Sequence, residues 1–172
     1  MPEPLPSPAS EGGRPRPNIE QFLPLFRTGG LSYFGYRMVL ASRLFDRRIQ
    51  QILGRHSGLT LPQWRVLSQL GLSPEGTVRS LADGAAVDRA EVSRVLRELE
   101  DRGFVTRRID EADRRRPLFS LTPAGTALFQ HVRAPIGHFI QHLVDDVAAA
   151  DLEAADRVLW AVTSGCLSDD SF

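Results

Sequence analysis

The sequence contains no lysine. All 21 basic residues of the 172-residue chain are arginines, and they are balanced by 21 acidic residues, so the formal net charge is zero. A chain without net charge has no bulk attraction to a polyanion, which excludes a histone-like protein that binds nucleic acid through overall charge alone. Any nucleic-acid binding must come from local segregation of charge. Because every cation is a guanidinium, each can make bidentate contacts with a phosphate.

Cysteine is nearly absent as well. The single Cys166 excludes an internal disulfide framework and a cysteine zinc cluster, and its apolar surroundings predict a core or interface residue. We find no signal-peptide pattern and no apolar run of membrane-spanning length, so we expect a cytoplasmic protein without a membrane partner. A hydrophobic content of 42% and a charged content of 24% are globular values, and the length suits one domain or one subunit that shares its core with a partner.

The charge is segregated along the chain. Nine arginines lie between residues 89 and 116, whereas the charged residues between 145 and 170 are all acidic apart from Arg157. The arginine-rich stretch opens with a predicted helix, which Asp88 caps and which Glu91 supports by reaching back to form a capping box. Gly103 is placed for a left-handed C-terminal cap. Apolar residues at helical spacing define an inward face: Val92, Val95, Leu96 and Leu99.

The opposite face of this helix combines phosphate-seeking charge with short side chains. Its members are Arg89, Ala90, Ser93, Arg94 and Arg97. Short side chains let a helix sit deep in a DNA groove, and arginines contact phosphates and base edges, so the pattern is that of a recognition helix. For an isolated helix, a plain solvated charged face is the more common explanation, and the neighbouring segments therefore matter.

Two short strands follow the helix, at residues 104–109 and 117–121, with a polar tip between them. The tip carries three consecutive arginines that one neighbouring aspartate cannot all neutralise: Arg114, Arg115 and Arg116. Such a hairpin tip can lie along a DNA minor groove, where the negative potential is strongest when the groove is narrow. Upstream, Thr77 can cap a short helix with Leu81 and Ala82 inward, and residues 84–87 supply a tight turn. The order is that of a helix-turn-helix followed by a wing.

Five segments in this order resemble the MarR family of bacterial winged helix-turn-helix regulators. They are LPQWRVLSQL at 61–70, LAD at 81–83, SRVLRELEDRGFVTRR at 93–108, DEADRRR at 110–116 and LTPAG at 121–125. One departure is Glu111, which stands where the family usually has proline after the first wing aspartate. The resemblance implies a mainly α fold with a small antiparallel β wing, double-stranded DNA as partner, and a repressor that dissociates from a near-palindromic operator when a ligand binds.

The remaining sequence predicts four segments. Residues 1–17 hold six of the 12 prolines and predict a disordered arm. Residues 18–60 predict N-terminal dimerisation helices, a short one at 18–27 and a long one that ends at Gly54. Residues 61–121 form the winged helix-turn-helix, whose opening helix turns Trp64, Val66, Leu67 and Leu70 inward, and residues 122–170 form C-terminal dimerisation helices. We expect Thr122 to cap the first of these, Pro135 to bend or break it, and Asp151 to cap the second. Their apolar stripes exceed what a small winged helix can cover, so we expect a homodimer, as the resemblance also implies.

The resemblance further implies a small aromatic or anionic effector bound between the dimer helices and the winged helix. Candidate lining residues are Phe22, Tyr33, Tyr36, Arg37, Trp64, Arg65 and Phe139. Core packing is the alternative for each aromatic, and surface or interface ion pairs are the alternative for the two arginines.

The sequence gives less support to a metal site or an enzyme active site. His131, His138 and His142 fall on one helical face, and His138 with His142 has the spacing of a zinc-binding pair, yet the N-terminal helices offer few further ligands. We therefore predict no metal and no cofactor, and keep a metal-responsive regulator as an alternative. No nucleophile-base spacing and no glycine-rich phosphate loop are present, which predicts that the chain is not an enzyme. A winged-helix protein that acts through protein contacts is the remaining alternative.

Overall fold

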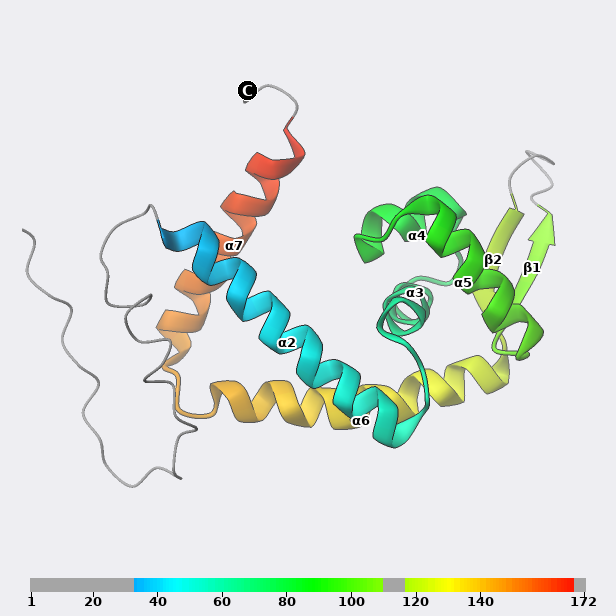
Figure 1. Cartoon of the computed structure of the whole chain (residues 1–172), viewed down its shortest axis with the longest axis horizontal. Helices are drawn as coiled ribbons and strands as arrows, with labels where there is room; N and C mark the ends of the chain where they lie inside the picture. Colours follow the sequence, from blue (N-terminus) through cyan, green and yellow to red (C-terminus); the bar gives the residue numbers. More distant parts are fainter. Residues whose placement is uncertain (1–32, 110–116, 169–172) are drawn as a thin grey trace, which may run out of the picture. The chain divides into compact units, whose positions relative to one another are not determined.

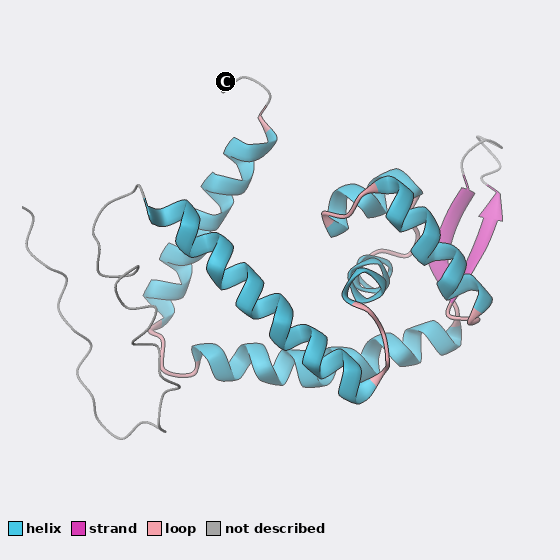
Figure 2. Ribbon diagram, viewed as in Figure 1, coloured by secondary structure: helices cyan, strands magenta, loops and turns pink. Residues whose placement is uncertain are grey.

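The computed structural model describes residues 33–109 and 117–168 (Figure 1). The predicted arm and the helix expected before residue 33 lie outside these residues. The described elements are α2 (Phe34–His56), α3 (Leu61–Leu72), α4 (Val78–Ala85), α5 (Arg89–Asp101), β1 (Val105–Ile109), β2 (Pro117–Leu121), α6 (Pro123–Val144) and α7 (Ala149–Leu167). The chain is thus mainly helical with one small antiparallel hairpin, as the sequence predicts (Figure 2). None of the described helices is long and apolar enough to cross a membrane.

Two compact units divide the chain, residues 1–47 and residues 48–172, and α2 contributes to both. The second unit holds the hydrophobic core. Its largest fully buried side chains come from the end of α2 and from α3, α5 and α6: Leu53, Val66, Leu67, Val92, Leu96, Leu99 and Val132. Leu81 and Ala82 of α4 join them, so the inward faces predicted for α3, α4 and α5 are confirmed. The expected division into dimerisation and DNA-binding segments stays a prediction.

Threonine caps begin three of the helices. The Thr77 side chain accepts a hydrogen bond from the Ser80 N–H at 3.1 Å, and the Thr122 side chain accepts one from the Gly125 N–H at 3.0 Å, as expected for α4 and α6. Thr60 caps α3 in the same way and forms a complete capping box with Gln63. Each cap satisfies a backbone donor that the first helical turn leaves unpaired.

The end of α2 corrects one prediction. The helix does not end at Gly54 but continues to His56, and the Leu53 carbonyl accepts hydrogen bonds from the N–H groups of Ser57 (2.9 Å) and Gly58 (3.0 Å). Gly58 is the residue with a left-handed φ of 64°. A glycine ends a helix when it adopts this conformation, which residues with a side chain rarely do, and Gly54 has no such role.

The C-terminal helices correct one prediction and narrow two others. Pro135 does not break α6, which runs through it as a single helix of 22 residues and ends at Val144; the buried neighbours Val132 and Ile136 hold it in the core. Asp151 does not cap α7: the N-cap is Ala148, without a side-chain bond, and Asp151 lies in the first turn, where its charge still complements the helix dipole. Cys166 is exposed on α7, which excludes the core of this chain, and the interface stays the prediction for it.

The start of α6 is docked onto the turn between α5 and β1. The Thr122 N–H donates to the Phe104 carbonyl at 3.1 Å, and the Thr122 hydroxyl donates to the Gly103 carbonyl at 2.7 Å. A side chain at Gly125 would overlap the Phe104 carbonyl oxygen, so only glycine permits this close approach of two backbones.

We predict that Gly125→Ala lowers the free energy of unfolding by about 1–3 kcal/mol, since the docked junction must move to admit a methyl group. Gly137→Ala in the same helix is the matched control, because nothing lies within 4 Å of a side chain built there. It should raise the free energy of unfolding by up to about 1 kcal/mol, through the higher helix propensity of alanine. Urea unfolding of both variants measures the difference, and equal stability of the two would contradict the close-approach argument.

Candidate nucleic-acid interface

Helix α5 is closed at both ends by local hydrogen bonds. Asp88 accepts from the Ala90 N–H at 2.8 Å, which confirms the predicted cap. At the other end Gly103, with a φ of 74°, donates to the Glu100 carbonyl, while the Phe104 N–H donates to the Leu99 carbonyl, both at 2.9 Å. This pair of bonds is the Schellman motif. The ends of α5 are therefore set by its own sequence.

The predicted capping box at the start of α5 is wrong in its second half. The Glu91 carboxylate does not return to the N-cap but pairs with the Arg94 guanidinium one turn on, at 3.2 Å. A carboxylate and a guanidinium three residues apart on a helix face each other directly, and Asp88 already serves the N-terminal donors. The first turn keeps its cap and gains an acidic residue beside the basic face.

The outward face of α5 is exposed and basic. Arg89, Ala90, Arg94 and Arg97 are exposed and Ser93 is half-buried. The Ser93 hydroxyl donates to the Arg89 carbonyl at 2.9 Å, and the Arg97 Nε donates to the Ser93 carbonyl at 3.2 Å. These bonds hold the Ser93 and Arg97 side chains against the backbone of α5. Its geometry suits a helix that enters a groove with arginines at its edges.

A polar brace behind α5 links it to α3. The Gln63 Nε2 donates to the Glu98 carboxylate at 2.8 Å, and the Gln63 Oε1 accepts from the Thr60 N–H at 3.0 Å and from Arg102 at 3.5 Å. Gln63 is buried, so these partners satisfy an amide that water cannot reach. The brace fixes the position of α5 against α3.

The turn between α4 and α5 is shorter than predicted. Gly84 lies inside α4, and the chain turns at Ala86, which adopts a left-handed φ of 50°. Gly84 instead allows a close approach: its carbonyl accepts from the Gln69 Nε2 at 2.9 Å, and a side chain at position 84 would collide with that amide. The glycine thus serves helix packing rather than the turn.

The wing is anchored to the segment between α3 and α4. β1 pairs with β2 in an antiparallel register that sets Val105 opposite Leu121 and Ile109 opposite Pro117. Gly76 extends this pairing, because its N–H and carbonyl each bond to Phe119 at 2.9 Å. The tip with Arg114, Arg115 and Arg116 lies outside the described residues.

A bidentate ion pair reinforces the anchor, and sequence reasoning missed it. Arg108 on β1 donates from Nε and Nη2 to the Glu75 carboxylate at 2.9 and 2.8 Å. The partners are 33 residues apart, so no local pattern indicates the pair. Sequence reasoning also left out Arg79, on α4, and Arg107, on β1; both are exposed, and Arg79 lies 4.0 Å from Asp83.

The residues proposed to line an effector site fall in both units. Tyr33 and Tyr36 are exposed and Arg37 is half-buried in the first unit, and Phe22 lies outside the described residues. In the second unit Trp64 and Phe139 pack against the core, which is the alternative raised for them. Arg65 is half-buried on α3.

Two contacts define the surroundings of these aromatics. Trp64 stacks on Phe129, with ring centroids 5.9 Å apart, and the Arg48 guanidinium lies 5.8 Å from the Phe139 ring centroid. One turn from Trp64, the Ser68 hydroxyl is buried without a hydrogen-bond partner. An unpaired buried hydroxyl is unfavourable unless a further group satisfies it.

The histidine face does not form a cluster. His131 makes an edge contact with His56, with ring centroids 6.3 Å apart, and His142 pairs with Asp145 at 3.2 Å. Within residues 33–109 and 117–168 no group of three or more His, Cys, Asp or Glu side chains is placed to hold a metal ion.

Part of the sequence matches a known protein family. Residues 59–116 match the model of the MarR family. The chain is 29% identical over 108 residues to the homoprotocatechuate degradative operon repressor of Escherichia coli, covering 63% of this chain and 72% of that protein. It is also 29% identical over 131 residues to the transcriptional regulator HosA of Escherichia coli O157:H7, covering 72% and 93%.

Solved structures share the fold. A MarR family transcriptional regulator from Silicibacter pomeroyi superposes with a TM-score of 0.73 at 26% identity, over 81% of this chain and 96% of that one. Sco3205 from Streptomyces coelicolor, in complex with DNA, gives 0.72 at 19%, over 94% and 96%. NadR in complex with 4-hydroxyphenylacetate gives 0.68 at 20%, over 78% and 94%. These matches indicate a DNA-binding transcriptional regulator rather than an enzyme, as the motifs predict, and residues 59–116 form a domain of the MarR family.

Proposed function

We propose that the chain is a cytoplasmic transcriptional repressor that binds a near-palindromic DNA operator as a homodimer and is released by a small aromatic or anionic ligand. The observation that carries this proposal is the outward face of α5, a basic surface on a helix capped at both ends and braced to α3. Repression is supported by the similarity to the homoprotocatechuate degradative operon repressor of Escherichia coli.

In this proposal α5 enters the major groove. Arg89, Ala90, Ser93, Arg94 and Arg97 contact bases and nearby phosphates, and the wing arginines Arg114, Arg115 and Arg116 serve the adjacent minor groove. The anchor of β1 and β2 to the α3–α4 segment supports a wing held at a fixed angle to α5. The structure of Sco3205 with DNA supports the use of this fold on a duplex.

We predict that Arg94→Ala weakens operator binding by about 1–3 kcal/mol and lowers the salt dependence of binding, because it removes a charged contact from the centre of the face. Fluorescence anisotropy with DNA from upstream of the chain's own gene, at several salt concentrations, measures both effects. Arg55→Ala is the matched control: it removes the same charge from the last turn of α2. Unchanged affinity and salt slope for Arg94→Ala would refute this surface, and sequence-independent protection in a footprint would favour action through protein contacts.

Exposed apolar side chains support the homodimer. None of the residues of α7 is buried, and Leu152, Val158, Leu159 and Trp160 are 37%, 45%, 52% and 74% exposed. Surfaces of this kind mark protein interfaces. A two-fold axis would place two copies of α5 about 34–36 Å apart, one turn of DNA, which is why we expect a near-palindromic operator.

We predict that Leu159→Glu converts the dimer to a monomer at micromolar concentration, since an unpaired carboxylate buried in an apolar interface costs several kcal/mol. Sedimentation equilibrium measures the change. Ala161→Glu is the control, because it adds the same charge at an exposed position of α7 on the side opposite the stripe of Leu152 and Leu159. A Leu159→Glu protein that stays dimeric, or a wild type that is monomeric, would exclude α7 from the interface.

The effector proposal rests on the relatives and on the surroundings of Trp64. One relative regulates the degradation of homoprotocatechuate, and one similar structure, NadR, contains 4-hydroxyphenylacetate. Both compounds are aromatic acids. In this chain the Arg65 guanidinium and the unpaired Ser68 hydroxyl lie on α3 within a turn of Trp64. Tyr33, Tyr36, Arg37, Phe139 and Phe22 remain the other proposed contacts. A ligand would act through different affinities for the DNA-bound and free arrangements.

We predict that 4-hydroxyphenylacetate raises the melting temperature, and that the rise grows with the logarithm of the ligand concentration once this exceeds the dissociation constant. At a free ligand concentration one hundred times the dissociation constant, binding adds about 2.7 kcal/mol to the free energy of unfolding. The neutral 4-hydroxyphenylacetamide is the matched control and should stabilise less, because it offers no charge to a guanidinium. Arg65→Gln should reduce the stabilisation by the acid. Equal stabilisation by the acid and the amide, or no stabilisation by either, would refute an anionic aromatic effector beside Trp64 and Arg65.

A further inference from the structure

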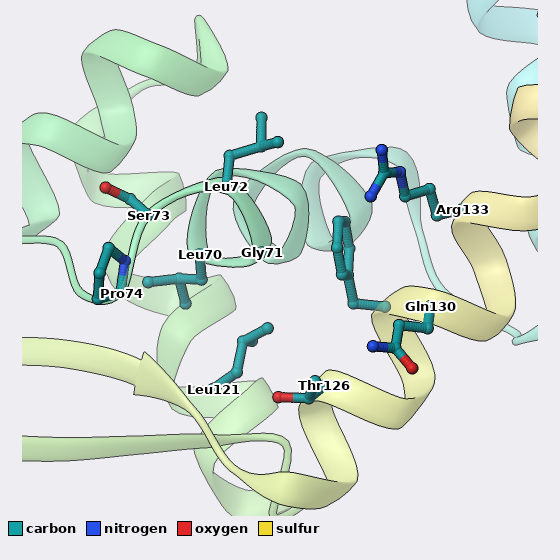
Figure 3. A pocket seen from close by; sticks show the side chains of 10 residues that line it. Leu70, Gly71, Leu72, Ser73, Pro74, Leu121, Thr126, Gln130 and Arg133 are labelled. Atoms are coloured by element: carbon teal, nitrogen blue, oxygen red, sulfur yellow. The ribbon is translucent and has the colours of Figure 1, made fainter.

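A hollow of about 490 Å³ lies on the second unit, and none of the residues that line it is among those assigned above to DNA or effector binding. One side is formed by the last turn of α3 and by Ser73 and Pro74, which follow it. The other side is formed by Leu121 at the end of β2 and by the first half of α6 (Figure 3). Its volume falls within the range of about 300–1,000 Å³ found for small-molecule sites.

The apolar wall of the hollow is fixed by the packing of Phe129. A side chain at Gly71 would come within 2.6 Å of the Phe129 ring, so the ring lies directly against the backbone of α3. The ring also stacks on Trp64 of the same helix. Because these two contacts with α3 hold Phe129, the hollow has a fixed aromatic wall, which Leu70 and Leu121 continue.

The charge in the hollow comes from Arg133. It is the one charged residue in the lining, and its guanidinium carbon lies 5.9 Å from the Phe129 ring centroid. Within the described residues no carboxylate pairs with it. Thr126 and Gln130 precede it on the same face of α6 and also line the hollow. One side of the hollow therefore offers a cation, an amide and a hydroxyl, opposite an apolar wall.

We propose that this hollow is a second ligand site, which binds a small organic anion. Arg133 and Gln130 hold the carboxylate, and a one-ring or similar apolar body packs against Phe129, Leu70 and Leu121. A guanidinium without a carboxylate partner favours an external anion, and the aromatic wall favours an apolar body over a simple inorganic ion.

The position of the hollow connects it to the wing. Ser73 and Pro74 lead directly to Glu75 and Gly76, which hold β1 and β2 in place through Arg108 and Phe119. Leu121, on the other side, is the last residue of β2. An occupant thus touches both segments that set the wing, and it changes the affinity for DNA. This consequence rests on the proposed DNA-binding function, whereas occupancy of the hollow does not.

The test titrates the full chain with 3-phenylpropionate, followed by calorimetry and by methyl NMR of leucine. We expect saturable shifts of the Leu70 and Leu121 methyl signals. Arg133→Gln should weaken binding at least about tenfold, as should replacing the probe by neutral 3-phenylpropionamide. Arg55→Gln, the matched loss of one guanidinium elsewhere, should leave binding unchanged. Thr126→Trp, which fills the hollow without changing its charge, should abolish the Leu121 shift.

Operator affinity, measured on the same samples without probe, separates the two proposals. Loss of probe binding in Arg133→Gln with operator binding intact supports the site. If the chain binds operator but the probe shifts neither Leu70 nor Leu121, or if these shifts survive Arg133→Gln, the site is overturned and the regulator proposal stands. Saturable, Arg133-dependent binding by a chain that does not bind operator supports the site and overturns the proposed regulator.

Discussion

The buried apolar stripe of α5 is the contact on which the rest of the interface depends. Val92, Val95, Leu96 and Leu99 are all at most 2% exposed, and they fill the space between α3, α4 and the hairpin. Rotating α5 about its axis would expose this stripe and bury arginines without partners, and each change costs free energy. The packing therefore decides which side of the helix meets solvent, and with it the chemistry of the outward face.

Polar contacts then join the parts of that surface into one block. Gln63 ties the end of α5 to the start of α3, and Glu75 with Gly76 ties both strands of the wing to the α3–α4 segment. Each contact is a hydrogen bond or ion pair between elements far apart in sequence. A perturbation of the α3–α4 segment would reach the wing through them, which is why a ligand site beside that segment has a physical route to DNA affinity.

Apolar surface is used in two ways in this chain. In the second unit it closes a core around α3, α5 and α6, whereas no residue of α7, in the same unit, is fully buried. A helix that exposes Trp160 and Leu159 to water is unfavourable by itself, and the proposed pairing of two copies would remove this cost. For a regulator of the MarR family, the same pairing would place two recognition helices on one face of DNA.

Local interactions let the sequence determine much of this structure. The caps at Asp88, Thr77 and Thr122, the left-handed Gly103 and the apolar stripes depend on residues a few positions apart, so pattern alone predicted them, as it did the family. Only tertiary structure decided that α6 continues through Pro135 and that Arg108 is bound to Glu75. The first outcome depends on the packing of Val132 and Ile136, and the second on a partner 33 residues away. The sequence pattern shows which side chains each helix or strand carries, but only the packing of these elements against one another determines which side chains come into contact.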